Sequence, residues 1–204
     1  MKTKFLVLSI ALSSSFFYSQ SQVDTTPDKN FLNVLKGTSF HGHVRNFTMA
    51  TFNQDDLTNY ATNATGGMVR IITPEIQGFK AGIAGSVTYK TIGNDLGALN
   101  VESDKSSKWE FELYDSFNKG NFDHLIRFDE FFLSYQYKKH YLSYGKIKIV
   151  DTPVINTSDG TMHRVAHKGT WLHLDFNTTH IFDVGWLDGV SPRASYDWFD
   201  FDEA

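Results

Sequence analysis

Two clusters of residues in this sequence could do chemistry, and one is a pair of glutamates separated by a single residue. Glu110 and Glu112 lie in the alternating stretch SKWEFELY, so a β-strand there would put both carboxylates on one face. At a rise of about 3.3 Å per residue they would stand about 7 Å apart, close to the separation that glycosidases use. Tyr114, not a third acid, occupies the next position on that face. No further carboxylate therefore supports a catalytic role for the pair.

Two histidines form the other candidate cluster. His41 and His43 flank Gly42, and in a strand they would share a face as two metal ligands do. Zinc needs three or four ligands, and no third one is identifiable, so we expect ordinary histidines and no metal or other cofactor. The sequence also contains no Ser-His-Asp pattern, phosphate-binding loop or nucleotide-binding fingerprint. It therefore predicts a protein that is not an enzyme.

The N-terminus has the pattern of a secretory signal peptide. Two lysines precede an apolar run over residues 5–18, and small residues follow up to Ser21. We expect cleavage after Ser21, which excludes residues 1–21 from the fold and leaves 22–36 as an N-terminal lead-in. No other apolar stretch approaches the roughly 20 residues of a transmembrane helix. Any membrane-spanning part must therefore be made of strands.

The composition of the remaining chain restricts the classes of partner. Loss of Lys2 and Lys4 reduces the 19 basic residues to 17, against 23 acidic ones, which gives a net charge of −6. That balance offers no basic surface for nucleic acid. The chain has no cysteine, so an exported form must be held by its core or by a closed hydrogen-bonded sheet.

Alternation with a period of two runs through most of the chain and predicts an all-β protein. In FKAGIAGSVTYK, for example, Phe79, Ile83 and Val87 share one face and Lys80 and Lys90 lie on the other. One apolar and one polar face are typical of antiparallel strands. A short helical turn is also expected over residues 28–36. The eight predicted strands cover about 38–52, 62–74, 79–92, 107–116, 124–138, 140–150, 168–177 and 180–188.

The predicted connections alternate in length. PEIQG, KKH and NTTH are tight, whereas residues 94–107 and 151–168 form long connections. Short turns at one end and long loops at the other are typical of outer-membrane barrels. The charged strand faces suit a water-filled lumen, but they suit the surface of a soluble sandwich equally well. Alternation alone therefore leaves both a transmembrane barrel and a secreted β-sandwich open.

Three segments resemble the outer-membrane porins of the OprD type, in the form found in Bacteroidetes-like bacteria. They are GHVRNFTMATFNQDDLTNYATNATGGMVRIITPEIQGFKAGIAG, FDHLIRFDEFFLSYQYKK and YGKIKIVDTPVINTSDGTMHRVAHKGTWL. The last is similar to the family's strand ending in Gly-Arg/Lys, followed by Thr-Pro, Asn-x-x-Asp-Gly-Arg-Met and Gly-x-Trp. The resemblance runs from about residue 37 to 176.

This resemblance implies an antiparallel transmembrane β-barrel whose third long loop folds inward as a constriction. Residues 37–204 would be the N-terminal half, about eight strands of a 16–18-stranded barrel. The implied function is a porin of the outer membrane that lets small polar or charged solutes diffuse through. Its partners would be outer-membrane lipid and those solutes, with a homotrimer left open for the complete protein.

The resemblance and the strand alternation together nominate pore-lining residues. Arg45 and Lys146 match basic positions of the family, and Asp159 matches the loop aspartate. Thr161 replaces the family's loop arginine, for which Arg164 can substitute one register away. The expected lining and constriction residues are Arg45, Glu130, Lys146, Lys148, Asp159 and Arg164. The expected lipid-facing band comprises Phe79, Ile83, Val87, Phe131, Leu133, Ile147, Leu172 and Leu174, with Ile149 continuing the face of Ile147.

Length and terminus depart from the family pattern. Family members are about twice as long and end on an aromatic residue, whereas this chain ends DFDEA. We therefore expect a truncated gene or a partial record, and no conducting pore from this chain alone. The alternatives are a secreted β-sandwich glycoside hydrolase or carbohydrate-binding module, and a small eight-stranded barrel with a structural or adhesive role.

Overall fold

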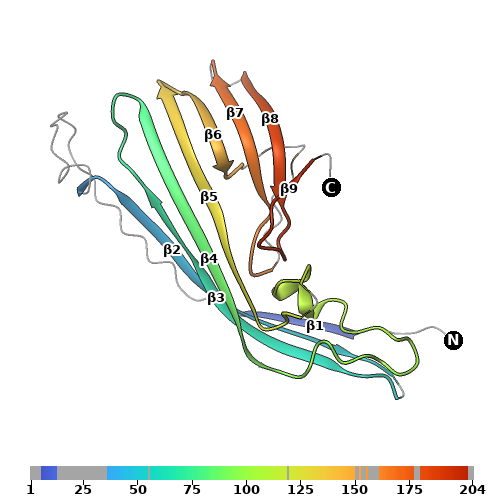
Figure 1. Cartoon of the computed structure of the whole chain (residues 1–204). Helices are drawn as coiled ribbons and strands as arrows, with labels where there is room; N and C mark the ends of the chain where they lie inside the picture. The colour runs from blue at the N-terminus through green and yellow to red at the C-terminus, as the bar shows by residue number, and fades with distance from the viewer. Residues whose placement is uncertain are drawn as a thin grey trace.

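A single antiparallel sheet dominates the computed structural model, and each strand pairs with the next one along the chain (Figure 1). The structure describes residues 6–12, 36–54, 56–118, 120–149, 152, 155, 161–176 and 180–201. The strands are β1 (Leu6–Leu12), β2 (Ser39–Phe52), β3 (Tyr60–Ile72), β4 (Phe79–Gly93), β5 (His124–Tyr137), β6 (His140–Ile147), β7 (Ala166–Asp175), β8 (Ile181–Ser191) and β9 (Phe199–Asp200). Among the described residues, the eight strands β2 to β9 form a curved open sheet, and β1 pairs with β2 at its edge.

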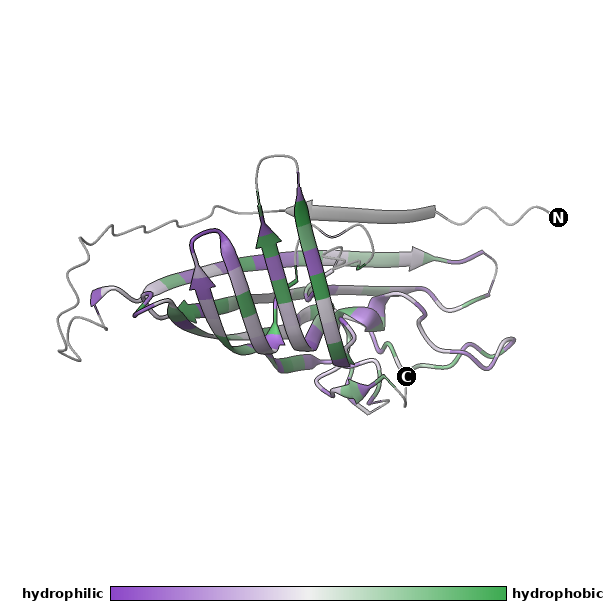
Figure 2. Cartoon of the chain, turned by 90° about the horizontal axis from the view of Figure 1, so that it is seen from above, coloured by the Kyte–Doolittle hydropathy of each residue, from purple (hydrophilic) through white to green (hydrophobic). Residues whose placement is uncertain are grey.

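The predicted all-β antiparallel fold is confirmed, and seven of the predicted strands are present. Their apolar and polar residues alternate along each strand, as the banding of Figure 2 shows. β1 lies inside the expected signal peptide, and the expected turn over residues 28–36 falls outside the described residues except for Lys36. Among the residues described, no helix has the length and hydropathy needed to cross a membrane.

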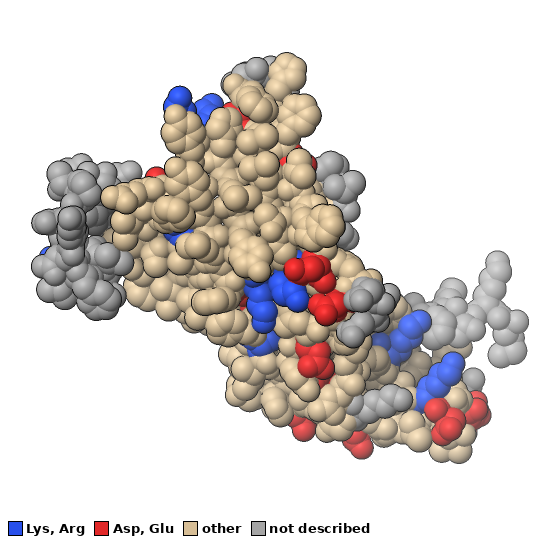
Figure 3. All heavy atoms as spheres, turned by 45° about the horizontal axis from the view of Figure 1, so that its top comes forward, with Lys and Arg blue, Asp and Glu red and all other residues tan. Residues whose placement is uncertain are grey.

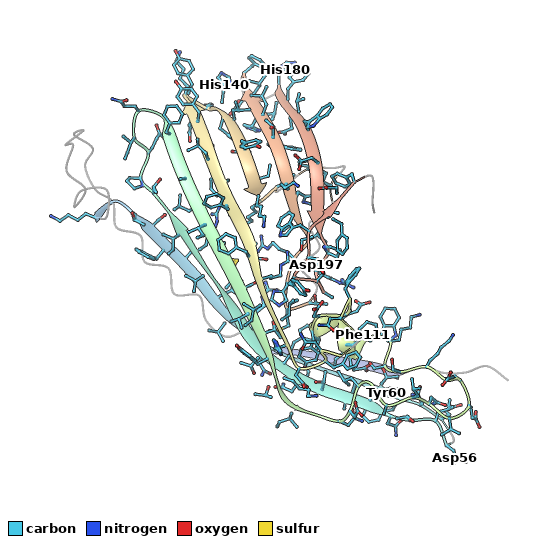
Figure 4. All side chains as sticks on the ribbon, in the orientation of Figure 1. Asp56, Tyr60, Phe111, His140, His180 and Asp197 are labelled. Atoms are coloured by element: carbon cyan, nitrogen blue, oxygen red, sulfur yellow. The ribbon has the colours of Figure 1, made fainter. Side chains whose placement is uncertain are left out.

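The connections alternate between short and long, as the sequence predicted. Residues 73–78, 138–139 and 176–180 connect strands at one end of the sheet, where Figure 4 labels His140 and His180. Residues 53–59, 94–123, 148–165 and 192–198 connect strands at the opposite end, where Asp56 is labelled. Successive connections lie at alternate ends of the sheet because each strand reverses the direction of the one before it.

The strand predicted over residues 107–116 is wrong. The segment instead contains a short 3-10 helix, η1 (Glu110–Leu113), within the long connection from β4 to β5. Glu110 and Leu113 are both fully buried, so the side chains follow a period of three and not of two. Glu110 accepts a hydrogen bond from Thr51 Oγ1 at 2.6 Å and another from Ser107 Oγ at 2.6 Å. These hydrogen bonds hold the segment against the sheet, and an extended strand would not keep it there.

The two faces of the sheet differ sharply in chemistry. Paired residues of neighbouring strands share a face, so the row Ile83–Phe131 and the row Leu133–Tyr144 both lie on the outer face. Phe131, Leu133 and Tyr144 are 65%, 53% and 66% exposed. The large exposed apolar residues of this face are Phe40, Val44, Val69, Phe79, Ile83, Ile126, Phe128, Phe131, Leu133, Tyr135, Leu142, Tyr144, Val184 and Trp186.

The apolar cores are small and lie on the inner, concave side. One packs Tyr60 of β3 against Leu96, Leu113 and Tyr114 of the long connection and against Met162. η1 lies against β2 and β3 at this end of the sheet (Figure 1). The other core packs Trp171 of β7 against two isoleucines, Ile147 and Ile149. Chain connections, not a second sheet, therefore cover the inner face.

The expected facing of the segment around β6 is wrong. Lys146 pairs with Phe131, so it lies on the outer apolar face, whereas Ile147 and Ile149 are buried on the inner side at 3% and 2% exposure. The prediction placed both Phe131 and Ile147 toward lipid, which the register forbids because they belong to opposite faces. The outer apolar residues of β6 are Leu142 and Tyr144, both exposed.

Candidate functional site

Charged side chains gather on the inner face because successive polar residues of β2 to β5 alternate with the outer apolar ones. Cross-strand pairing joins His41, Arg70 and Glu130 in one row, with Ala84 between the last two. The next row joins His43, Met68, Ser86 and Arg127. A third row joins Arg45, Gly66, Thr88 and Leu125. Several arginines from different strands thus lie on one wall.

An ion pair joins Arg70 and Glu130 of the first of these rows. Arg70 Nε donates to Glu130 Oε2 at 2.7 Å, and the Glu130 side chain is only 5% exposed. The Arg70 guanidinium also lies over the Phe132 ring, 5.8 Å from its centroid. Because Glu130 is nearly covered, loss of Arg70 would leave a buried carboxyl group without its ion-pair partner.

A second arginine ties the wall to the connection between β8 and β9. Arg127 Nε lies 2.6 Å from Asp129 Oδ1, and Arg127 Nη1 donates to the carbonyl oxygen of Pro192 at 2.8 Å. Both side chains are almost fully buried. A β-bulge, in which Asp129 has no partner on β4, brings Asp129 and Arg127 to the same side.

The described end of the β6–β7 connection lies against this wall. Arg45 Nη1 donates to the carbonyl oxygen of Thr161 at 2.9 Å. The His163 ring is 4% exposed, with Nδ1 2.8 Å from Ser86 Oγ and Nε2 2.7 Å from Thr88 Oγ1. Burial is the main cause that lowers the pKa of His163 to about 3, and the charges of Arg127 and Arg45 add to it. The ring is therefore neutral at pH 7.

Four of the six predicted site residues come together around this segment. Glu130, Lys148 and Arg164 line one small hollow, and Arg45 and Arg164 line a neighbouring one together with His43 and His163. Each hollow is no larger than a water molecule needs. Residues 161–164 thus lie against the inner face of the sheet.

The other two predicted site residues do not join this group. Lys146 lies on the outer face, where its ammonium is 4.5 Å from the Trp198 ring centroid and 5.9 Å from that of Phe128. Its cross-strand neighbour Lys168 pairs with Asp188 and Asp200. Asp159 lies outside the described residues. In Figure 3 most of the face in view is uncharged, and basic and acidic side chains gather below its middle.

The two clusters first considered for chemistry do not form catalytic or metal geometry. Glu110 is buried in hydrogen bonds, whereas Glu112 forms an ion pair with Arg193, so the two carboxylates do not share an open strand face. His41 and His43 do share the inner face. Within the part of the chain that the structure describes, no three His, Cys, Asp or Glu residues are grouped as a metal site requires.

Sequence reasoning missed Arg70, Arg127, Asp129 and His163. The alternation in HLIRFDE could have indicated Arg127, because Ile126 and Phe128 occupy the opposite face. His163 has no such signal, since its partners Ser86 and Thr88 lie more than 70 residues away in the chain.

The arrangement offers a charged concave wall, partly covered by a hydrogen-bonded loop, behind a broad apolar outer face. Such a wall can attract and orient charged solutes. No family model, no curated protein and no solved structure matches this chain.

Proposed function

We propose that this protein is part of the wall of an outer-membrane channel through which small polar or charged solutes diffuse. The apolar outer face would contact lipid, and the charged inner face would line the aqueous passage. The assignment to porins of the OprD type rests on the sequence resemblance, and the channel function rests on the two faces.

The observation that carries this proposal is that the sheet exposes its apolar face and buries its polar one. A soluble β-sandwich buries its apolar face and exposes its polar one. Here Phe131, Leu133 and Tyr144 are more than half exposed, whereas Arg127 and Glu130 are 5% and 4% exposed. An apolar exterior around a polar interior is the pattern of transmembrane barrels. A continuous exposed apolar surface of this kind needs a nonpolar partner.

The inner face supports the passage of solutes by charge and not by chemistry. Arg45, Arg164 and Lys148 supply positive charge beside the acidic pair Asp129 and Glu130. Charges of both signs across a narrow aqueous gap produce a transverse field that orients dipolar solutes. Lys146 has no place in this passage, because it lies on the outer face.

Membrane insertion of a matched pair of arginine variants tests the proposal. Leu133 lies on the outer apolar face and is 53% exposed, whereas Val101 is 99% exposed in the β4–β5 connection. Leu133→Arg should lower the free energy of unfolding in lipid by about 2–4 kcal/mol if the residue lies near the bilayer midplane. Val101→Arg should change it by less than about 0.5 kcal/mol.

The measurement is urea titration of the protein folded into lipid vesicles, combined with extraction of expressed membranes at high pH. Wild type and Val101→Arg should stay with the membrane, and Leu133→Arg should be lost from it. Equal stability of both variants, with wild type released into the soluble fraction, would contradict the channel and favour a secreted sheet protein.

A further inference from the structure

Among the described residues of the β6–β7 connection, His163 contacts the inner face through both nitrogens of its ring. We propose that His163, with Ser86 and Thr88 of β4, fastens the end of this connection to the inner face of the sheet. His163 is thus a positioning residue. The fastening does not rest on the proposed channel function.

The geometry at the ring is specific for an imidazole. Ser86 and Thr88 stand two residues apart on β4, so their side chains lie on one face about 7 Å apart. The ring lies between them and uses both nitrogens, at 2.8 Å and 2.7 Å. A neutral imidazole has one N–H donor and one acceptor nitrogen, and a hydroxyl can serve as partner to either. Both nitrogens are therefore satisfied in a site with 4% exposure.

Neighbouring residues fix the same segment by independent contacts. Thr161 accepts the hydrogen bond from Arg45 of β2 through its carbonyl oxygen. Met162 is 5% exposed and packs in the core with Tyr60 and Tyr114. Three consecutive residues therefore engage β2, the core beside β3, and β4. Such a combination fixes position and orientation, which a single contact could not.

These contacts place the end of the connection across the inner face of the sheet and not beside the strands that it joins. It leaves β6 and enters β7, yet it is bound to β4, which lies two strands from β6 and three from β7. At about 4.8 Å per strand, the segment reaches at least about 10 Å across the concave side.

Loss of the two hydroxyls provides the direct test. The double variant Ser86→Ala/Thr88→Val removes both partners and leaves His163 in place. Its matched control is Ser134→Ala/Ser143→Ala, because these hydroxyls form a buried 2.9 Å pair on the same inner face between β5 and β6. The conservative exchange Ser86→Thr/Thr88→Ser keeps both hydroxyls and should behave as wild type.

Modification by diethylpyrocarbonate, followed residue by residue by mass spectrometry, reports exposure of each histidine. At pH 7 in lipid, His163 should react at least about tenfold faster in Ser86→Ala/Thr88→Val than in wild type, the control or the conservative exchange. If that variant does not fold, His163→Phe should speed amide exchange over residues 161–165.

Unchanged protection of His163 in Ser86→Ala/Thr88→Val, or unchanged amide exchange in His163→Phe, would overturn the fastening. Faster modification of His163 in Ser86→Ala/Thr88→Val alone would support it.

Discussion

His163 should make the docking of the β6–β7 connection sensitive to acid. Its pKa lies near 3 when docked and near the ordinary 6.5 when exposed to water. Protonation therefore favours the undocked form, and docking should weaken about tenfold per pH unit between about pH 6.5 and 3. The charged or titratable groups around the ring are Arg45 and His43 on β2, Arg127 and Asp129 on β5, and Arg164 beside it.

Amide exchange over residues 161–165, measured at pH 7.5 and 4.5 and corrected for the intrinsic rate, checks this prediction. In wild type, the equilibrium constant for docking should be about a hundredfold smaller at pH 4.5 than at pH 7.5. His163→Gln, which keeps a donor and an acceptor but does not titrate, should lose none. Equal acid sensitivity in both proteins would assign the effect to another group.

Lys146 shows where sequence reasoning about single residues fails. Its family match and its alternation with Ile147 both predicted a lumen position, but the strand carries apolar residues on both faces. Only the register with β5, which pairs Lys146 with Phe131, decides which face is outside. Arg45 and Glu130, which were predicted to line a pore, lie on the inner face of the sheet.

The strands themselves were predictable and the connection before β5 was not. Period-two alternation and turn residues located β2 to β8 to within a few residues. The six residues from Lys108 to Leu113 alternate between polar and apolar as a strand would, although Glu110–Leu113 form a 3-10 helix. Its burial depends on Thr51 and on the core beside β3, both distant in sequence.

The pairing of β6 with β5 should depend on Gly145. This residue has φ +118°, and a Cβ there would lie 2.3 Å from the carbonyl oxygen of Phe131 on the neighbouring strand. Gly145→Ala should therefore lower the free energy of unfolding by about 1–3 kcal/mol. Gly85→Ala is the control, because its Cβ would meet only ordinary contact at 3.5 Å and it should change stability by less than about 1 kcal/mol.

Urea titrations of the two alanine variants in one lipid or detergent give this comparison directly. The midpoint should fall for Gly145→Ala and stay close to wild type for Gly85→Ala. Similar midpoints for both variants would show that β6 adjusts its backbone, and that its register with β5 is not fixed by the glycine.

The sheet as a whole has a free edge, and this edge decides whether it can serve as a membrane wall. Among the described residues, β9 pairs only with Gly189 and Val190 of β8, so residues 181–188 have no strand on that side. Amides of an antiparallel strand point alternately to its two sides. Inside lipid, an unpaired amide lacks water and costs several kcal/mol, so a wall must pair this edge with a further strand.

Hydrogen exchange along β8 distinguishes a closed wall from an open sheet. In lipid, every amide from residue 182 to 187 should be as well protected as the amides of β7, because both sides of β8 are then paired. In a soluble open sheet, alternate amides of the same stretch should exchange rapidly while the others, bonded to β7, stay protected. Alternating exchange in lipid would show that the edge remains open there. It would contradict the proposed channel, since charges on the inner face would then have no enclosed aqueous passage to line.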